Sequence, residues 1–277
     1  MAIEAAEHYD VLVVGAGGAG VAAAITAAEA GARVAVLAKE PIGYGNTRIA
    51  GGGMATGDEA LFADVMESAA GLAESETVRI LADDAAAAFA DILRYGQIFR
   101  TDPDGTFLAS RPGGHSRKRT VSSPNSGASL GQTLRGAVTR LDIDLLEEVM
   151  VCELVCEGQG ARHIAGLIAY DMVDGRFLNL RAPAVILATG GAGWLFYPNT
   201  DNLRSITGDG YALALQAGAG LVDMEQVQFL PFSIAHPESV RGTFVGEPGR
   251  VGGPAGVLRL ADGSVVTDGL NRRTRDE

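Results

Sequence analysis

A glycine-rich segment that joins an apolar strand to an alanine-rich helix constrains this chain most. Residues 10–14 (Asp-Val-Leu-Val-Val) are typical of a buried parallel strand. Residues 18–30 favour a helix that ends at Gly31, and residues 33–37 predict a second strand. Such a β-α-β unit within about 30 residues predicts an α/β domain with a Rossmann-like, doubly wound parallel sheet.

The turn of this unit has the spacing of a phosphate-binding loop. The first glycine permits a tight turn, the second allows the backbone to approach a pyrophosphate, and the third lets the helix pack on the strand. The N-terminus of the helix adds partial positive charge. We therefore expect a dinucleotide to be bound by Gly15, Ala16, Gly17, Gly18, Ala19 and Gly20.

The acidic residue that usually binds the ribose is not at its usual position. Ala38 and Lys39 occupy the tip of the second strand, and Glu40 comes just after it. This spacing does not support a standard NAD site. It fits FAD only with a different ribose anchor.

The remaining pattern predicts further helices and strands. Residues 58–96 and 128–140 favour helices, whereas residues 144–181 form short alternating strands with a hairpin signal at Asp174-Gly175. Residues 184–188 predict another buried strand, which is followed by Thr189 and Gly190. Asp209 is expected to cap a helix over 210–217 that ends at Gly218.

Composition excludes several classes of protein. The net charge of −12 argues against nucleic-acid binding, because such a chain lacks a broad basic face. No apolar run is long enough to span a membrane, and the first residues lack the pattern of a secretory signal. The two cysteines and four histidines show no spacing typical of metal ligands, so we expect no metal. The expected location is the cytoplasm.

Two other groups of residues have simple structural interpretations. Residues 100–126 are expected to form a loop that holds the densest basic stretch, and a solvated surface is favoured over an anion site. Cys152 and Cys156 are expected to be small core residues. Of the histidines, His115 and His236 are favoured to face a substrate. The basic stretch comprises Arg111, His115, Arg117, Lys118 and Arg119.

Several blocks in this order resemble one family of flavoproteins, the fumarate reductase, succinate dehydrogenase and L-aspartate oxidase superfamily. The first block runs from Gly15 to Gly20, continues through Leu37-Ala-Lys39, and extends over residues 45–54. The second runs over residues 188–193, 207–210, 217–219 and 223–228. The soluble fumarate reductase branch is most similar around Asn46-Thr47 and Gly52-Gly53-Met54.

The resemblance implies that FAD is the cofactor. Asn46 occupies the position of the histidine that carries a covalent flavin in membrane-complex members, so non-covalent FAD is implied. Val149 lies on a strand that is expected to flank the adenine. Besides Gly15–Gly20, the implied FAD-binding residues are Ala38, Lys39, Gly45, Asn46, Thr47, Ala50, Gly51, Gly52, Gly53, Val149, Ala188, Thr189, Gly190 and Asp209.

The resemblance also implies a reaction, namely hydride transfer between flavin N5 and a C–C bond activated by a carboxylate or carbonyl. Glu247 matches a proton-relay glutamate, and Arg275 matches an arginine that donates a proton or clamps the transition state. Leu230 departs from the pattern, because it replaces a histidine that binds a substrate carboxylate and cannot donate a hydrogen bond. The implied partners are a carboxylate or enoate substrate and an electron-transfer partner subunit.

Family members are considerably longer than this chain, which stops at Arg275-Asp276-Glu277. We expect residues 1–231 to form the N-terminal part of an FAD-binding domain and residues 232–277 to begin a truncated α+β capping domain. The alternative function is a catalytically incomplete FAD-binding fragment or subunit that works only with a partner chain. A pyridine-nucleotide disulfide oxidoreductase would need a second glycine motif and a redox cysteine pair, and the sequence has neither.

Overall fold

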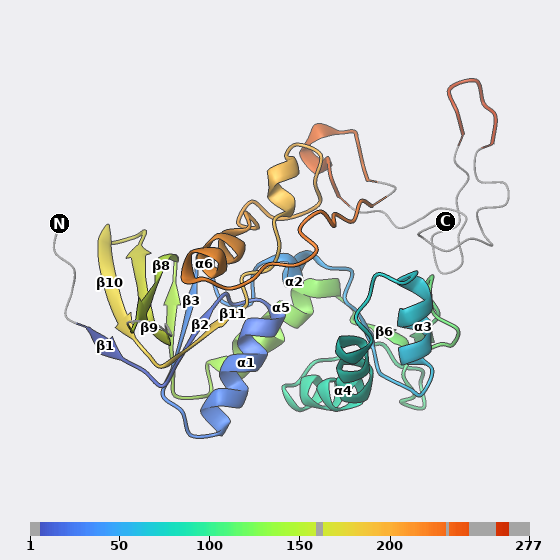
Figure 1. The fold of residues 1–277 in the computed structure, drawn as a ribbon. Helices are drawn as coiled ribbons and strands as arrows, with labels where there is room; N and C mark the ends of the chain where they lie inside the picture. The colour runs from blue at the N-terminus through green and yellow to red at the C-terminus, as the bar shows by residue number, and fades with distance from the viewer. Residues whose placement is uncertain (1–5, 159–162, 231–232, 244–258, 266–277) are drawn as a thin grey trace. The chain divides into compact units, whose positions relative to one another are not determined.

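The computed structural model describes residues 6–158, 163–230, 233–243 and 259–265 (Figure 1). The chain divides into two compact units. The first unit comprises Met1–Ala50 and Ser126–Gln228, and the second comprises Gly51–Asn125 and Phe229–Glu277.

A four-stranded parallel sheet forms the centre of the first unit (Figure 1). Its order is β11 (Ala184–Leu187), β2 (Val11–Val14), β3 (Val34–Ala38) and β7 (Ile143–Glu147). All three strand pairs are parallel. The central strands β2 and β3 are short, apolar and rich in valine, as expected for strands that are covered on both faces. The outer strands β7 and β11 are less buried, and β7 carries Asp144 and Glu147. The predicted Rossmann-like sheet is thus confirmed.

Helices and a second sheet accompany the parallel sheet. Helix α1 (Gly18–Glu29) contacts β2, β3 and helix α5 (Ser126–Val138). Leu12, Val14 and Leu37 belong to one hydrophobic cluster with residues of the second sheet, such as Val149 and Leu167. Alternate strand residues point to opposite faces, so this sheet covers one face of the parallel strands.

The second sheet has the order β1 (Glu7–His8), β10 (Arg176–Arg181), β9 (His163–Asp171) and β8 (Val149–Glu157). Strands β8, β9 and β10 are antiparallel neighbours, whereas β1 pairs with β10 in parallel. The turn between β9 and β10 contains Gly175 at φ +69°, which fits the predicted hairpin. Helix α6 (Asp209–Ala217) packs on β8 and follows the 3-10 turn η1 (Gly193–Phe196).

The second unit combines two helices with a small antiparallel sheet. The helices are α3 (Leu61–Ser68) and α4 (Ser75–Arg94), and a short 3-10 turn η2 covers Glu238–Val240. The sheet has the order β4 (Gly53–Ala55), β6 (Thr120–Ser122) and β5 (Ala109–Ser110). Phe89 of α4, Phe99 and Val121 of β6 form a buried hydrophobic cluster in this unit. Strands β5 and β6 lie in the segment that was expected to be loop, because two- and three-residue strands leave no readable alternation.

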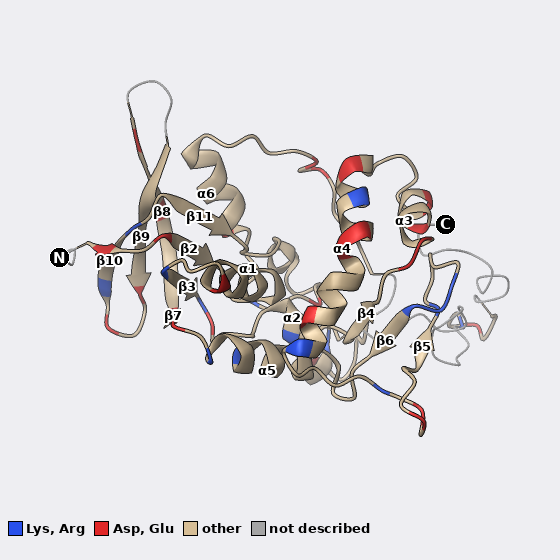
Figure 2. Ribbon diagram, turned by 90° about the horizontal axis from the view of Figure 1, so that it is seen from below, with Lys and Arg blue, Asp and Glu red and all other residues tan. Residues whose placement is uncertain are grey.

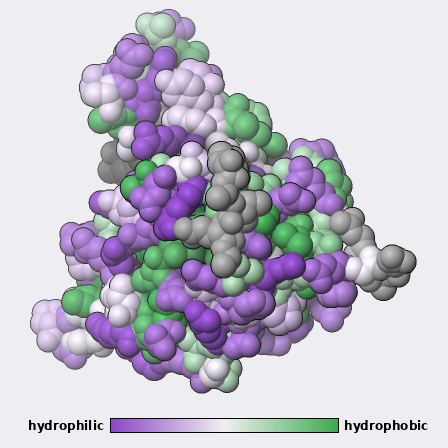
Figure 3. All heavy atoms as spheres, turned by 90° about the vertical axis from the view of Figure 1, so that its left-hand side faces the viewer, coloured by the Kyte–Doolittle hydropathy of each residue, from purple (hydrophilic) through white to green (hydrophobic). Residues whose placement is uncertain are grey.

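The expected boundary near residue 231 stays a prediction, since much of 232–277 lies outside the described residues. Within the described ranges, no helix is long and apolar enough to cross a membrane. Acidic residues gather on α3 and α4 (Figure 2). Seen from the side of β10, hydrophobic residues form separate patches among hydrophilic ones (Figure 3).

Candidate cofactor site

A cavity lies in the first unit, where the strands β2, β3 and β11 end. In open parallel sheets, ligands bind in the crevice outside the carboxyl ends of the strands. The residues around the cavity come from the glycine turn, the ends of β3 and β11, strand β8 and the beginning of α6. They include Gly15–Ala19, Ala38–Pro41, Tyr44–Thr47, Val149, Val151, Ala188–Gly190, Ser205, Ile206, Asp209 and Leu213.

Two glycines of the motif are required by close backbone approach. Gly15 has φ +105°, and a Cβ there would lie 2.3 Å from the carbonyl oxygen of Ala188. A Cβ on Gly20 would lie 1.9 Å from the carbonyl oxygen of Gly15. The turn leads directly into α1, and Gly17, Gly18 and Ala19 at the start of this helix line the cavity. This backbone cradle fits a pyrophosphate.

Thr47 and Asn46 link the cavity wall to neighbouring segments. The N–H of Gly18 donates a hydrogen bond of 2.9 Å to Oγ1 of Thr47. The side-chain amide of Asn46 donates to Oδ1 of Asn202, and its Oδ1 accepts from the N–H of Leu203 at 3.1 Å. Both ends of the Asn46 amide are therefore used within the protein, which is consistent with a side chain that positions the loop.

A charged pair lies at the rim of the cavity. Nζ of Lys39 lies 2.5 Å from Oδ2 of Asp209 and donates to Oγ1 of Thr207 at 2.9 Å. The Thr207 hydroxyl donates to Oδ1 of Asp209 at 2.6 Å. Burial by itself raises the pKa of Asp209, but the bonds from Lys39 and Thr207 outweigh it and hold the pKa below its usual value. Asp209 is therefore an anion in the cavity.

Asp209 does not cap α6 as predicted. The N-cap is Gly208 in a left-handed conformation, without a side-chain cap, and Asp209 is the first helical residue. The Asp209 carboxylate forms an ion pair with Lys39 and therefore does not accept a hydrogen bond from the N–H groups at the start of the helix. The predicted end of the helix at Gly218, which has φ +95°, is confirmed.

The loop after β3 is clamped to the rest of the first unit. The N–H of Ile42 donates to Oε1 of Glu147 at 2.7 Å, and Arg135 donates to the Ile42 carbonyl at 3.3 Å and pairs with Glu147. The N–H of Gly43 donates to the carbonyl of Ala16 at 3.0 Å. The loop that carries Glu40 and Tyr44 is thereby fixed against the glycine turn.

The structure places most predicted FAD-binding residues around one cavity, but not all. Ala50 and Gly20 do not line the cavity, and Gly20 instead allows α1 to pack closely against the Gly15 carbonyl. Gly51, Gly52 and Gly53 belong to the second unit. Glu247 and Arg275 lie outside the described residues. Glu40 is a lining residue that the sequence could have indicated, since it comes two residues after the end of β3. The predicted set lacks nine lining residues, namely Val14, Leu37, Glu40, Pro41, Tyr44, Val151, Ser205, Ile206 and Leu213.

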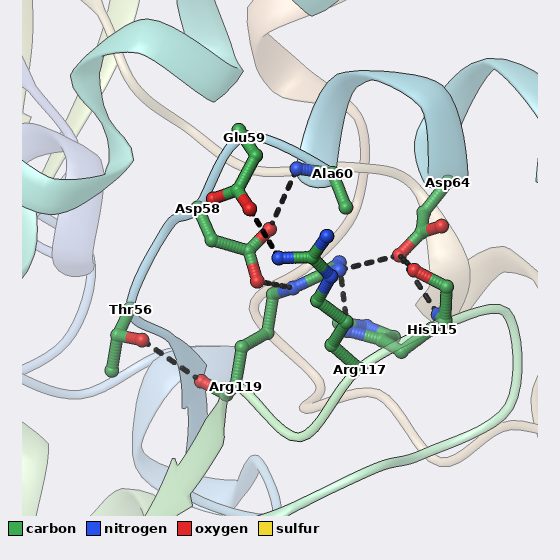
Figure 4. A network of polar contacts seen from close by, with 9 residues as sticks. Thr56, Asp58, Glu59, Ala60, Asp64, His115, Arg117 and Arg119 are labelled. Carbon is green, nitrogen blue, oxygen red and sulfur yellow. Dashed lines mark hydrogen bonds and ion pairs between the residues drawn. The ribbon is translucent and has the colours of Figure 1, made fainter.

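The prediction that the basic stretch is a solvated loop is wrong for Arg119, which is only 2% exposed. Its Nε donates to Oδ2 of Asp58 at 3.0 Å, and its Nη2 forms a 2.6 Å ion pair with Asp64 (Figure 4). Arg117 pairs with Glu59 at the surface. The acidic partners precede or begin α3 and are far away in sequence, so the local pattern of charges did not reveal them.

His115 and Asp64 belong to the same network. Nδ1 of His115 lies 3.4 Å from Nη1 of Arg119, and burial together with this cation lowers the pKa of His115. Burial alone raises the pKa of Asp64, but bonds from the Ser116 N–H, Arg119 and the Ser116 hydroxyl lower it below its usual value. The network holds the segment 115–119 against α3. His236, the other histidine favoured to face a substrate, is exposed.

The two cysteines also differ from expectation. Cys152 is exposed and Cys156 is partly buried, so neither is a core residue. Strand β8 has register irregularities between Val151 and Glu153 and between Val155 and Cys156. Cys152 is exposed because it alternates with the buried Val151, and the irregularity after Val151 brings Leu154 to the core.

Comparison with known proteins identifies the family of this chain. The sequence matches the family described as FAD binding domain over residues 10–275. The chain belongs to this family. The glycine cradle, the helix N-terminus and the wide cavity along the strand ends fit its cofactor, which is FAD.

Relatives place the chain among fumarate reductase, succinate dehydrogenase and L-aspartate oxidase flavoproteins. It is 35% identical to a fumarate reductase (CoM/CoB) chain of Methanothermobacter marburgensis, over 92% of this chain and 47% of that protein. It is 37% identical to L-aspartate oxidase of Streptomyces coelicolor, over 80% of this chain and 40% of that protein. The predicted resemblance is confirmed.

Solved structures agree. Sdh1 of Mycobacterium smegmatis in complex with UQ1 has a TM-score of 0.82 and 33% identity, covering 94% of this chain and 46% of that one. A point mutant of FrdA from Escherichia coli quinol fumarate reductase has a TM-score of 0.72 and 30% identity. The match covers 76% of this chain and 37% of the FrdA chain. The chain therefore spans about half the length of these relatives or less.

Proposed function

We propose that this chain is the FAD-binding part of an oxidoreductase that transfers hydride between a flavin and a carbon beside a carboxylate or carbonyl. When bound, FAD supplies the redox chemistry at N5 of its flavin ring. The chain binds and orients the cofactor. The proposed substrate of the family-length protein is a carboxylate or an enoate.

Each wall of the cavity has a role in this proposal. The backbone of Gly15–Gly18 and the N-terminus of α1 would hold the pyrophosphate. Val149 and Val151, which are 4% and 7% exposed, would cover the adenine end. Thr47 and Asn46 would set the path of the loop beside the flavin. We propose that the flavin is non-covalent, because the Asn46 amide lacks a nucleophilic ring nitrogen and is bonded to Asn202 and Leu203.

The observation that carries the proposal is the meeting of these groups in one cavity. The glycine turn, the Lys39–Asp209 pair and the buried residues of β8 come from separate parts of the sequence, and all of them line it. A titration of the purified chain with FAD, followed by protein fluorescence and visible absorption, tests the proposal directly. Saturable binding of FAD is expected.

Proton handling is a proposal based on the resemblance. Glu247 and Arg275 are assigned the proton relay and the clamping of the substrate carboxylate, respectively. Leu230 replaces the usual histidine, so another donor must bind that carboxylate. In a family-length protein, Glu247→Gln and Arg275→Lys should lower kcat while FAD affinity stays unchanged. Loss of FAD binding in either variant would contradict this assignment.

A second candidate is an FAD-binding chain that is catalytically incomplete alone and acts with a partner chain. It is favoured by Leu230, because a leucine cannot bind the substrate carboxylate that the usual histidine of the family pattern binds. An electron-transfer partner and a cytoplasmic location are part of both proposals. Reduction of dicarboxylates and enoates by chemically reduced protein distinguishes them: turnover by this chain alone supports a complete enzyme, and binding of FAD without turnover supports the second candidate.

A further inference from the structure

Asn46 joins two walls of the cavity that are far apart in the sequence. One wall is the loop Tyr44–Thr47, and the other is the segment before α6, which contributes Ile206. The side-chain amide of Asn46 donates to Oδ1 of Asn202, and its Oδ1 accepts from the N–H of Leu203 at 3.1 Å. Because a backbone N–H can only donate, the bond from Leu203 fixes which way the Asn46 amide points. Two segments separated by 156 residues are thereby tied together at the cavity.

Asn202 is itself held in place by neighbouring residues. Its N–H donates to Oγ1 of Thr200 at 3.1 Å, and its side-chain amide donates to Oδ1 of Asp201 at 2.9 Å. The carboxamide also lies against Gly193, since a Cβ on that glycine would be 2.3 Å from Cγ of Asn202. Asn202 therefore presents its Oδ1 to Asn46 from a fixed position. Such preorganisation reduces the entropy that ligand binding must overcome.

The segment that carries Asn202 is also braced through its main chain. The N–H of Trp194 donates to the carbonyl of Ile206 at 3.0 Å, so this wall is bonded to the turn η1. Asn202 itself is not among the described residues that line the cavity. Its influence on a ligand must therefore pass through Asn46, which does line the cavity.

We propose that Asn202 is a positioning residue for the flavin, which holds Asn46 and thereby fixes the separation of the two walls that receive the flavin ring. This inference rests on the proposed function, in which the loop at Asn46 and Thr47 lies beside the flavin. The glycine turn and β8, to which that function assigns the pyrophosphate and the adenine, take no part in the contact between the two asparagines. Loss of Asn202 therefore disturbs the flavin end of the site and spares the ADP end.

The first test compares Asn202→Ala with Asn199→Ala, a matched control at an exposed asparagine of the same segment. Calorimetric titrations of the full 277-residue chain use FAD and ADP. Asn202→Ala should weaken FAD roughly 3- to 10-fold, the effect of losing one neutral hydrogen bond. It should leave ADP within about 2-fold, and Asn199→Ala should change neither ligand by more than that. Equal losses of FAD and ADP affinity in Asn202→Ala would overturn the inference.

A double-mutant cycle tests whether Asn202 acts through Asn46. In the Asn46→Ala background, Asn202→Ala should cause little further loss of FAD affinity, because the contact is already absent. Independent losses that add up would contradict the proposed coupling.

Gly193→Ala disturbs the same contact without removing either asparagine. Gly193 has no positive φ, so its backbone accepts an alanine, but the new Cβ must displace the Asn202 carboxamide. This variant should reproduce the loss of FAD affinity with ADP unchanged. It also carries the test if Asn202→Ala does not fold. Wild-type FAD affinity in folded Gly193→Ala protein would count against the inference.

A spectroscopic readout separates positioning from a general loss of stability. FAD bound to Asn202→Ala should have a visible absorption band closer to that of free FAD than the wild type shows, and FAD should raise its melting temperature less. A folded variant with the wild-type FAD affinity and spectrum would refute the role of Asn202. If the folded wild type does not bind FAD at all, the proposed function itself fails.

Discussion

Lys39 and Asp209 form an ion pair of 2.5 Å that joins the end of β3 to the beginning of α6. Both residues line the cavity, and their side chains are 26% and 33% exposed. Thr207 bridges them by accepting from Lys39 and donating to Asp209. The pair thus neutralises its own charge at the rim and holds two segments that must stay in place when a cofactor binds.

Breaking this pair should weaken FAD binding. Lys39→Met leaves the Asp209 carboxylate partly buried without its cation, which places an uncompensated negative charge beside a negatively charged ligand. We expect roughly a 10-fold or larger loss of FAD affinity in a fluorescence titration, since truncating one partner of such a pair costs about 2 kcal/mol or more. Lys118→Met is the control at an exposed site. Equal affinities for both variants would contradict the role of the pair.

The glycine at the start of α1 should not tolerate a methyl group. Gly20→Ala places a Cβ 1.9 Å from the Gly15 carbonyl oxygen, so the helix must move away from the turn. We expect a loss of about 1–3 kcal/mol or more in the free energy of unfolding, measured by urea denaturation. Gly136→Ala in α5 is the matched control, because its nearest neighbour is 4.0 Å away. That change should stabilise by about 0.5–1 kcal/mol. The reverse ranking would contradict the packing described.

The buried Arg119 should matter far more than its neighbour Arg117. Arg119→Met leaves Asp58 and Asp64 without their cation in a site where the arginine side chain is 1% exposed. Removing one member of a buried ion pair costs about 3–5 kcal/mol. Arg117→Met removes an exposed pair with Glu59 and should cost about 1 kcal/mol or less. Urea denaturation of both variants measures the contrast, and similar losses would refute it.

The stability of the protein should fall as the pH is lowered through the range of His115. Its folded pKa is held below the ordinary value of 6.5 by burial and by Arg119, so the unfolded chain binds the proton first. The contribution of neutral His115 to the free energy of unfolding is therefore fully present above pH 6.5. It is lost as the pH falls towards the folded pKa of His115. His115→Gln should flatten this part of the stability–pH curve, measured by urea midpoints. An unchanged curve would show that His115 is not involved.

The sequence predicts the β-α-β unit well, because it is encoded locally. The run of β-branched residues before Gly15, the alanine-rich helix and Gly31, which has φ +90°, each specify one element without distant help. The blocks around Lys39 and Asp209 identify the cofactor through their order. These features depend on residues close in the chain, and they are the features that the structure and the relatives confirm.

Other parts depend on contacts between distant residues. The sequence around Arg119 predicts a surface cation, because its partners Asp58 and Asp64 are more than 50 residues away in the chain. The short strands β5 and β6 likewise form only by pairing with each other and with β4. In β8, Cys152 is exposed as alternation from the buried Val149 and Val151 requires, whereas the register irregularity after Val151 leaves Glu153 exposed and Leu154 in the core. The ion pair between Asp209 and Lys39 likewise outweighs the local tendency of an aspartate to cap a helix.

A visible absorption spectrum of the purified chain after reconstitution with FAD, before and after acid precipitation, tests the central claim most directly. We expect a flavin spectrum with the folded protein and release of all flavin into the supernatant, because Asn46 offers no covalent attachment. A folded protein that stays colourless at saturating FAD would contradict FAD binding by this cavity. A yellow pellet would contradict the non-covalent assignment.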